Sequence, residues 1–482
     1  MSMAYQEHPA YKHFEAISRI PHGSGQEKAL SDYILFFAKN LKLQAVQDEI
    51  GNLVIRKPAA KGYENAPVVM LQGHLDMVCE KNMDVAHDFT REPLKLITEG
   101  DWLRAEGTTL GADDGVAVAY CMALMENDDI PHPALELVLT VQEETGLEGA
   151  TALDPGLVNG DMLINLDSGE EGVFLTSCAG GLKLDMDVPV AREAAPAGSV
   201  FARVRVTGLM GGHSGVDIDK GRGNSIRLMA ALLERLRTEY GARIASLLGG
   251  LKDNAIPREA EAVVCVPAEK LADALAAVEA YDAEVRPAYD EADPQLKILA
   301  AETDAADGVL TDDSARALLA FLLGLPNGPL AYSAAFPELV ETSNNVGVVR
   351  LGVDAAQVVC ALRSSVAASK HALAADIRAV AEKVNAAVLE HGEYPAWEYN
   401  PDSRLRELAV ETLEALSGQK AILAAVHAGL ECGLFAAKRP GLDMIAFGPT
   451  MRDIHSPLER LYLPSFIRTW ELLVEILRKI TA

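Results

Sequence analysis

Histidines and carboxylates follow the apolar runs of this sequence at several places. The stretch LQGHLDMV places His74 and Asp76 directly after the apolar residues 68–71, and side chains two apart on a strand point to the same side. Comparable positions hold Asp113 and Asp114 in GADDG, Glu143 and Glu144 in QEETG, Asp167 in NLDS and His455 in DIHSP. Strand ends of an α/β sheet gather in one crevice, so we expect these side chains to meet there.

Each of these residues has a simple structural explanation when it is taken alone. Asp113 suits a helix N-cap, and Asp167 suits the start of a turn. Together they would crowd carboxylates into one region, where like charges raise one another's pKa unless a cation holds them. Imidazole and carboxylate donors without thiolate suit zinc, manganese or cobalt. We therefore expect two divalent metal ions, with zinc as the first choice.

Length and charge restrict the classes of protein that remain. The chain has 482 residues and a net charge of −27, which indicates two or three domains and a surface that repels nucleic acid and anionic membranes. The first residues have neither a basic nor an apolar segment, so no signal peptide is expected. The six cysteines contain no C-x-x-C pair, so the predicted location is a reducing cytoplasm.

The order of the predicted elements indicates an α/β domain interrupted by an inserted domain. Strands and helices alternate up to about residue 186, and the same style returns after residue 400. Residues 187–399 predict a smaller α+β lid domain with one exposed sheet face, and residues 370–392 are expected to form one long helix that ends on Gly392. The predicted domains are residues 1–186 and 400–482, which form the catalytic domain, and the insertion at residues 187–399.

Several motifs in the same order resemble a known family. HLD, GADDG, QEETG, NLDS and the late IHSP, with CAGG, GGHSG, NAIPRE, ETSNNVGVV and HAGLECGLF, are similar to motifs of the two-zinc metallopeptidases that include aminoacylases, glutamate-releasing carboxypeptidases and carnosinases. The likeness runs over nearly the whole chain and is greatest to bacterial aminoacyl-histidine dipeptidases. It implies a zinc-peptidase catalytic domain with an inserted, ferredoxin-like lid.

The resemblance also implies a role for each residue of the first group. His74 and Asp167 would hold one metal ion, Glu144 and His455 would hold the other, and Asp113 would bridge them with room for a shared water. Asp76 would orient His74 through the second ring nitrogen. The peptide bond between Asp113 and Asp114 would be cis, and Asp114 departs from relatives that carry Asn at this position.

Glu143 is the predicted general base. On an extended backbone, neighbouring side chains point in opposite directions, so we expect Glu144 to face a metal ion while Glu143 faces the water that attacks the peptide carbonyl. A carboxylate in this place takes the proton and passes it to the leaving amine.

The lid contributes a second set of candidates. The resemblance implies that His213 in GGHSG stabilises the oxyanion, in relatives often across the interface of a homodimer. Asn254 and Arg363 are candidates for binding the substrate carboxylate, which the planar fork of Arg suits. In HAGLECGLF, His427 or Glu431 is expected to line the pocket, and Glu431 is a candidate for binding a free amino group.

These expectations describe a cytoplasmic metallo-dipeptidase that cleaves Xaa-His dipeptides such as β-alanyl-histidine. An amidohydrolase of N-acyl-amino acids, or a broader di- and tripeptidase, would use the same metal centre. A metal-binding scaffold without catalysis is the third alternative, and the presence of Glu143 beside a full set of ligands argues against it.

Overall fold

The computed structural model describes residues 3–481, and the chain divides into two compact units that are described separately. Unit 1 comprises Met1–Ser177, Tyr399–Ala425 and Leu430–Ala482, and unit 2 comprises Cys178–Glu398 and Val426–Gly429. The first boundary therefore falls before residue 178, where the sequence placed it before residue 187. The short segment Val426–Gly429 joins unit 2 although both flanking segments belong to unit 1.

Unit 1 contains an eight-stranded sheet whose centre is parallel. The strand order is β1-β2-β6-β3-β7-β23-β8-β22, and β6, β3, β7 and β23 are parallel to one another. The strands are β1 (Gln44–Gln47), β2 (Leu53–Lys57), β3 (Val69–His74), β6 (Leu135–Thr140), β7 (Met162–Asn165), β8 (Val173–Cys178), β22 (Ile422–Val426) and β23 (Asp443–Ala446). Every residue of β3, β6 and β7 is buried, as expected for strands that are covered on both faces.

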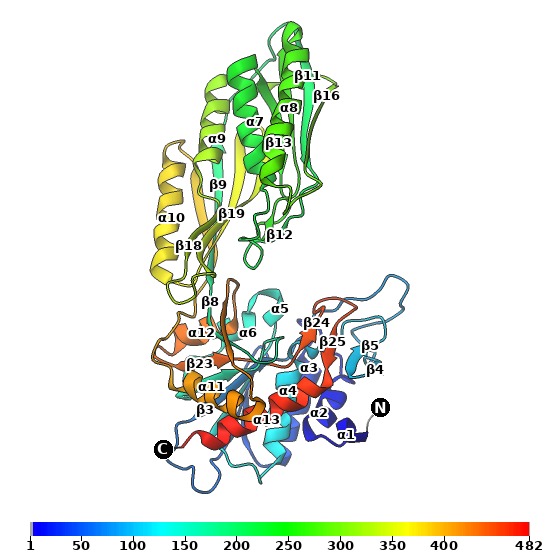
Figure 1. Ribbon diagram of the computed structural model, residues 1–482, viewed down its shortest axis with the longest axis vertical. Helices are drawn as coiled ribbons and strands as arrows, with labels where there is room; N and C mark the ends of the chain where they lie inside the picture. Colours follow the sequence, from blue (N-terminus) through cyan, green and yellow to red (C-terminus); the bar gives the residue numbers. More distant parts are fainter. Residues whose placement is uncertain (1–2, 482) are drawn as a thin grey trace. The chain divides into compact units, whose positions relative to one another are not determined.

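The helices of unit 1 cover this sheet. They are α1 (Met3–Gln6), α2 (Pro9–Ile17), α3 (Lys28–Asn40), α4 (Ala112–Glu126), α5 (Glu143–Gly146), α6 (Glu148–Ala152), α11 (Arg404–Ser417), α12 (Glu431–Lys438) and α13 (Leu463–Lys479). Residues 115–125 of α4 are all buried, because a helix that is apolar on every side must lie inside the protein. It lies beside α2 and α13 (Figure 1) and packs against α2 and β3. The rings of Tyr120 in α4 and Phe466 in α13 are 4.9 Å apart.

A small antiparallel sheet completes unit 1 and leads to the segment that carries His455. Its order is β24-β25-β5-β4. The strands are β4 (Leu96–Glu99), β5 (Trp102–Ala105), β24 (Met451–Arg452) and β25 (Arg460–Tyr462). Residues 453–459 thus form the loop of the β24–β25 hairpin.

Unit 2 is built on an antiparallel sheet of nine strands. Its order is β16-β11-β15-β13-β19-β20-β9-β21, with β18 paired to β19. The strands are β9 (Gly180–Pro189), β11 (Ser199–Thr207), β13 (Arg243–Gly249), β15 (Ala260–Pro267), β16 (Lys297–Thr303), β18 (Gly328–Tyr332), β19 (Val340–Leu351), β20 (Ala355–Ser364) and β21 (Ala387–Tyr394). Two pairs of short strands are separate from it, β10 (Arg192–Glu193) with β17 (Val309–Leu310) and β12 (Gly212–His213) with β14 (Ala255–Ile256).

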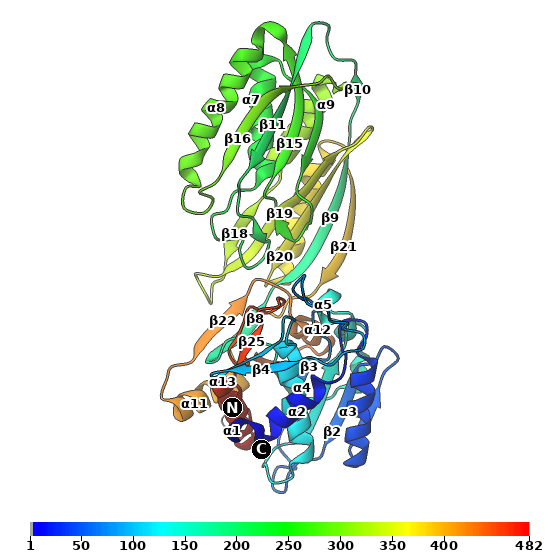
Figure 2. The same ribbon diagram turned by 90° about the vertical axis from the view of Figure 1, so that its right-hand side faces the viewer.

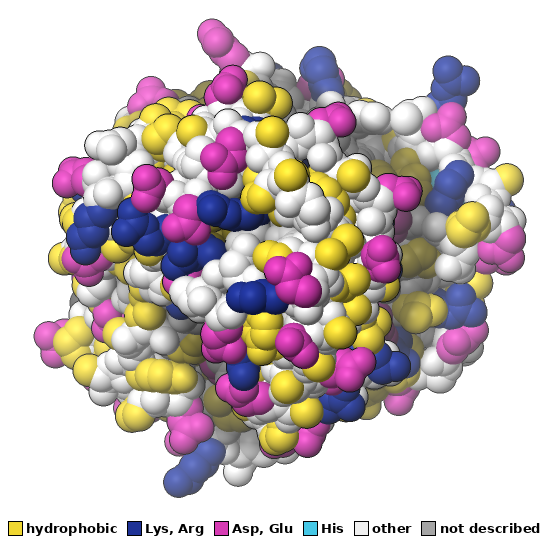
Figure 3. Space-filling view, turned by 90° about the horizontal axis from the view of Figure 1, so that it is seen from above, with side chains coloured by type: hydrophobic (Ala, Val, Ile, Leu, Met, Phe, Trp, Pro, Cys, Tyr) yellow, Lys and Arg dark blue, Asp and Glu magenta, His cyan; other side chains and the backbone are white. Residues whose placement is uncertain are grey.

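The helices of unit 2 cover one face of this sheet, and the sequence predicted that the other face is exposed. They are α7 (Ser225–Tyr240), α8 (Leu271–Val285) and α9 (Asp312–Gly324) (Figure 2), and α10 (Ala367–Glu382) (Figure 1). Alternate strand residues such as Val204, Ala262 and Val264 join the helices in one core, whereas Arg203 and Arg205 point to the exposed face. On the face drawn in Figure 3, acidic and basic side chains are interspersed.

The prediction of one long helix at residues 370–392 is wrong. Helix α10 ends at Glu382, Asn385 has a left-handed backbone with φ 54°, and residues 387–394 form β21 at the edge of the sheet, paired with β9. The sequence is rich in good helix formers, but pairing with a free sheet edge overrides that weak preference. Gly392 consequently lies in an irregular stretch of β21 rather than at a helix end.

Because β3 is the middle of the parallel sheet, truncation of its core side chains is expected to be costly. Leu71 is fully buried, so Leu71→Ala should lower the free energy of unfolding of unit 1 by about 2–5 kcal/mol. The exposed Leu416 of α11 provides the control, and Leu416→Ala should change stability by no more than about 0.5 kcal/mol. Chemical denaturation followed by circular dichroism checks both values, and equal losses would contradict this account of the core.

Candidate metal centre

The candidate ligands all follow the carboxyl ends of the parallel strands of unit 1. Strand β3 ends on His74, β6 ends three residues before Glu143, β7 ends two residues before Asp167, and β23 leads into the hairpin that carries His455. Asp113 and Asp114 open α4, which packs against β3. Parallel strands bring their carboxyl ends to one edge, and this topology gathers residues that are hundreds of positions apart in the sequence.

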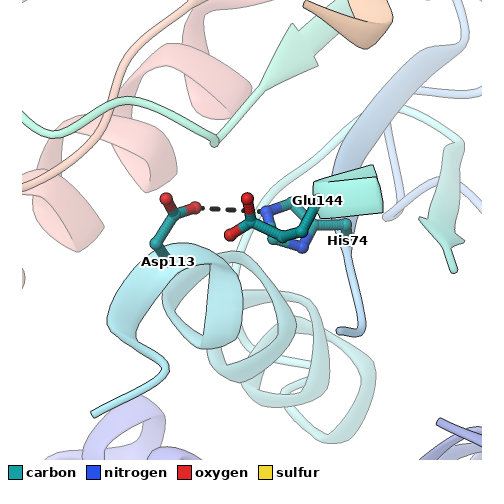
Figure 4. Close-up of side chains that lie close together, drawn as sticks. All are labelled: His74, Asp113 and Glu144. Carbon is teal, nitrogen blue, oxygen red and sulfur yellow. Dashed lines mark hydrogen bonds and ion pairs between the residues drawn. The ribbon is translucent and has the colours of Figure 1, made fainter. Parts of the chain in front are cut away.

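Asp113 lies between two imidazoles. Its Oδ1 is 3.1 Å from Nε2 of His74, and its Oδ2 is 3.3 Å from Nε2 of His455. The same nitrogen of His455 is 2.9 Å from Oε1 of Glu144. His74, Asp113 and Glu144 point toward one another (Figure 4). Each carboxylate oxygen of Asp113 therefore faces a different histidine.

Two groups of side chains have donor atoms close enough to share a metal ion. His74, Asp113 and Glu144 form one group, and His74, Asp114 and Asp167 form the other, with the donor atoms of each group within 4.8 Å of one another. The sequence did not propose Asp114 as a ligand. Its carboxylate is buried and accepts the backbone N–H of His74 at 3.2 Å and that of Ala117 at 3.3 Å. The peptide bond between Asp113 and Asp114 is cis, as predicted.

The surroundings of His74 favour the tautomer that suits a metal ligand. Its Nδ1 lies 3.0 Å from the main-chain carbonyl oxygen of Asp76 and 3.4 Å from Oδ1 of the same residue. A proton on Nδ1 satisfies these acceptors, and in the neutral ring it leaves the lone pair on Nε2. Nε2 is the atom that faces Asp113, so the donor set fits a divalent cation.

Asp76 also organises the backbone that carries the two glutamates. Its carboxylate accepts the Ser24 hydroxyl at 2.8 Å and the backbone N–H groups of Glu143 and Glu144 at 3.0 and 3.2 Å. The expected extended backbone at Glu143 and Glu144 is therefore wrong, because these residues form the first turn of the short helix α5. Asp76 accepts the otherwise unpaired N–H groups of that turn.

The pKa values show an excess of buried negative charge. Burial raises the pKa of Asp113, but the hydrogen bonds to His455 and His74 and the charges of these histidines together outweigh it, and the net pKa is well below its usual range. Burial and the neighbouring Asp113 raise the pKa of Asp114 and of Asp167. The bonds to Asp113 and Glu144 raise the pKa of His455 to about 10. Such a site favours added positive charge.

Glu143 differs from its neighbours because its carboxylate is unpaired. Within residues 3–481, no hydrogen bond or ion pair engages this side chain. Burial and the nearby Glu431 and Glu144 raise the pKa of Glu143 to about 8. A carboxylate whose pKa lies near neutrality is well suited to exchange protons.

The remaining candidates of the lid lie together in unit 2. The strand pair β12–β14 brings His213 beside Ala255, and the carbonyl of Asn254 accepts the N–H of Ser214 at 2.9 Å. Arg363 donates to the Tyr394 hydroxyl at 2.6 Å and lies 3.4 Å from Nε2 of His213. The Nε nitrogen of Arg363 is buried without a partner among the described residues, which leaves a donor for a ligand.

His427 belongs to the same unit, but Glu431 does not. His427 is buried and its Nε2 is 2.7 Å from the Ser343 hydroxyl oxygen. Glu431 begins α12 in unit 1, where it is fully buried and accepts bonds from Thr140 at 2.7 Å and from Gln72. Burial raises the pKa of Glu431 to about 7. The motif HAGLECGLF is thus divided between the two units.

Several residues at these sites had no signal in the sequence. Ser24 and Tyr394 belong to none of the motifs, and Ser343 lies within ETSNNVGVV but was given no role. The partners of these three residues are between 31 and 84 positions away in the sequence. Glu459 lies four residues after His455 and was not singled out, although it is a buried acid next to a proposed ligand. An acidic residue so close to a metal-ligand motif is the one signal that sequence inspection offers.

The fold and this cluster define an α/β protein with a candidate metal centre at the carboxyl ends of its parallel strands. The chain belongs to peptidase family M20/M25/M40, whose model matches residues 70–479. This confirms the resemblance that the sequence motifs indicated.

Two relatives are similar along nearly their whole length. The cytosol non-specific dipeptidase of Escherichia coli (strain K12) is 36% identical over 474 residues, which are 98% of each protein. The crystal structure of the aminoacylhistidine dipeptidase from Vibrio alginolyticus is also 36% identical, with a TM-score of 0.92 over 98% of this chain and 96% of that one.

More distant structures share the fold. The aminopeptidase PepT of Bacillus cereus is 17% identical, with a TM-score of 0.58 over 98% of both chains. The match to the Vibrio alginolyticus structure and to the family model confirms the predicted fold, an α/β domain with an inserted second domain. Among residues 3–481, no helix has the length and apolar character needed to cross a membrane.

The environment of His427 predicts a pH-dependent stability. Burial, Arg363 and His213 lower the pKa of His427 from 6.5 to about 3. Below pH 6.5 His427 takes up a proton in the unfolded chain but not in the folded protein. The contribution of neutral His427 to folding stability is therefore fully present above pH 6.5 and is lost as the pH falls toward 3. By pH 5 the loss should reach about 2 kcal/mol relative to pH 8.

The substitution His427→Gln removes this ionisable group and supplies a neutral amide that can bond Ser343. Denaturation at pH 8 and pH 5 should show that the variant loses about 2 kcal/mol less stability than the parent between the two pH values. An identical pH dependence of both proteins would show that His427 takes up its proton normally in the folded state.

Proposed function

We propose that this protein is a metal-dependent dipeptidase. The observation that carries the proposal is the cluster in which Asp113 faces His74 and His455 while the unpaired carboxylate of Glu143 lies beside them. Two relatives that are 36% identical over nearly the whole chain are named as dipeptidases. The natural substrate is a short peptide with a free amino terminus.

The residues divide into two sets of metal ligands in this proposal. His74 and Asp167 would hold one divalent cation, Glu144 and His455 would hold the other, and Asp113, whose two oxygens face different histidines, would contribute to both. Bound cations would polarise both the peptide carbonyl and the attacking water. Nitrogen and oxygen donors suit zinc, and manganese or cobalt are the alternatives. Asp114, which lies near His74 and Asp167, supplies additional negative charge beside the first cation.

Glu143 acts as the general base. It takes a proton from the attacking water and gives it to the leaving amine, and its carboxylate, which has no partner among the described residues, is free to do so. Asp76 holds Glu143 and Glu144 in place through their backbone N–H groups and orients His74. The acid therefore acts on the reaction through the residues that it positions.

Unit 2 supplies the groups that recognise the anionic parts of the substrate. His213 donates to the oxyanion, and Arg363 binds the substrate carboxylate together with Asn254. The unpartnered Nε of Arg363 supports this assignment. His427 lines the same region as a neutral imidazole. Glu431 is fully buried, and its Oε2 accepts bonds from Thr140 and Gln72, whereas its Oε1 has no partner among the described residues. It therefore stays a candidate for binding the substrate amino group.

The proposal extends to the domains, oligomeric state and location of the enzyme. We expect the enzyme to be a homodimer. Unit 2, which corresponds to the insertion predicted at residues 187–399, would act as the lid and dimerisation domain. A cytoplasmic location is consistent with six cysteines that form no disulfide within the described residues and with the name of the Escherichia coli relative.

Replacement of the proposed base tests the chemistry directly. Glu143→Gln removes the proton acceptor and should lower kcat by a factor of about 10² to 10⁴, while elemental analysis should find the parent's metal content. Glu148→Gln, at an exposed carboxylate in the same segment, should leave both quantities unchanged. Activity of Glu143→Gln within a few-fold of the parent would exclude Glu143 as the base.

A substrate panel separates the dipeptidase from its alternatives. The metal-loaded enzyme should cleave β-alanyl-histidine and other Xaa-His dipeptides, and N-acetylation of the same dipeptides should abolish cleavage because the free amino group is lost. Preferential cleavage of N-acetyl-amino acids would indicate the amidohydrolase, and equal cleavage of tripeptides would indicate the broader peptidase. No hydrolysis of any of these compounds would indicate a scaffold without catalysis.

A further inference from the structure

Glu459 is a buried carboxylate for which the proposed reaction has no role. Only 2% of its surface is exposed. It lies four residues after His455 and directly before β25, at the end of the hairpin loop that carries this histidine. A carboxylate that is removed from water needs donors, so its partners show what holds it there.

The partners are the backbone N–H groups that precede and open α4. Oε2 accepts those of Leu110 and Gly111 at 2.7 and 3.1 Å, and Oε1 accepts those of Ala112 and Asp113 at 2.8 and 3.4 Å. The N-cap residue of this helix is Gly111, which has no side chain that could bond these N–H groups. The side chain of Glu459 therefore fills the place of a cap, although it comes from a segment nearly 350 positions away.

This contact joins the backbones of two proposed ligands. Asp113 is itself one of the residues whose N–H Glu459 accepts. On the other side, the N–H of Glu459 donates to the carbonyl of Ser456 at 3.0 Å, which closes the turn next to His455. The His455 side chain is 47% exposed and its backbone has φ 60°, so little packing of its own fixes its position.

We propose that Glu459 is a positioning residue that sets the separation between Asp113 and His455, and that it thereby determines how tightly the second metal ion is held. The inference rests on the proposed function, because it assumes that these two side chains are ligands. Glu459 acts through the backbone of Asp113 and through the hairpin of His455.

Glu136 provides a matched comparison within the same unit. It is also buried, and its Oε2 accepts the backbone N–H groups of Asn159 and Gly160 at 2.7 and 2.9 Å while Oε1 bonds Arg56 at 3.0 Å. It lies near the start of β6, at the opposite end of this strand from Glu143. Glu136→Gln and Glu459→Gln thus remove similar bonds, but only the second change affects the ligands.

The test measures zinc affinity rather than activity alone. Metal-free protein is titrated with zinc by calorimetry, and thermal unfolding is recorded for each variant. A Gln at position 459 places an amide NH2 against backbone donors, so Glu459→Gln should weaken binding of one zinc ion by about 10- to 100-fold, and excess zinc should restore much of kcat. Glu136→Gln should lower the unfolding temperature and retain the parent's zinc affinity.

Two results would overturn the proposal. One is a zinc affinity of Glu459→Gln within twofold of the parent, and the other is an equal loss of affinity in Glu136→Gln, which would indicate a general effect of destabilisation. If Glu459→Gln does not fold, Glu459→Asp keeps the charge but shortens the reach and must show the same selective loss. Failure of the parent to bind zinc, manganese or cobalt would remove the proposed function as well, whereas equal binding by the parent and by both variants would remove only the role of Glu459.

Discussion

The crowding of buried carboxylates at one edge of the sheet is the constraint on which the candidate site depends. Isolated buried charges are costly, and adjacent like charges raise that cost. In unit 1 the cost is offset by specific donors for the acids that precede or flank the proposed ligands: Asp76 accepts two backbone N–H groups and a hydroxyl, and Asp114 accepts two backbone N–H groups. Asp113 is instead compensated by two imidazoles. A divalent cation would compensate the negative charge of the remaining buried carboxylates in the same way.

Two buried acids, Asp76 and Glu459, each accept the backbone N–H groups at the start of a helix. Asp76 accepts the N–H groups of the first turn of α5, and Glu459 accepts those that open α4. Each of these turns carries a proposed ligand, Glu144 in α5 and Asp113 in α4. A carboxylate from elsewhere in the chain thus holds the backbone of each ligand, which gives more precise placement than a mobile loop would.

The sequence was informative wherever local pattern and topology agree. Apolar runs followed by His74, Glu144 and Asp167 predicted that these residues meet, because parallel strands always end at a common edge. The pattern failed where a distant partner decides the local conformation. Asp76 turns Glu143 and Glu144 into a helix although they follow a strand, and pairing with β9 makes a strand of residues 387–394 although they continue a helical pattern. Glu459 was missed for the same reason, since its donors are far away in the sequence.

The division of HAGLECGLF between the units shows why substrate recognition is harder to predict than the metal centre. His427 and Glu431 are four residues apart, yet His427 lies with Arg363 and Ser343 in unit 2 while Glu431 lies beneath β3 and β6 in unit 1. The two environments carry opposite charge. Unit 1 gathers an excess of carboxylates, which favours cations, whereas unit 2 keeps His427 neutral beside the guanidinium of Arg363. The positive charge of Arg363 then remains available to an anion, and a dipeptide carboxylate has the charge and planar geometry that this guanidinium binds best.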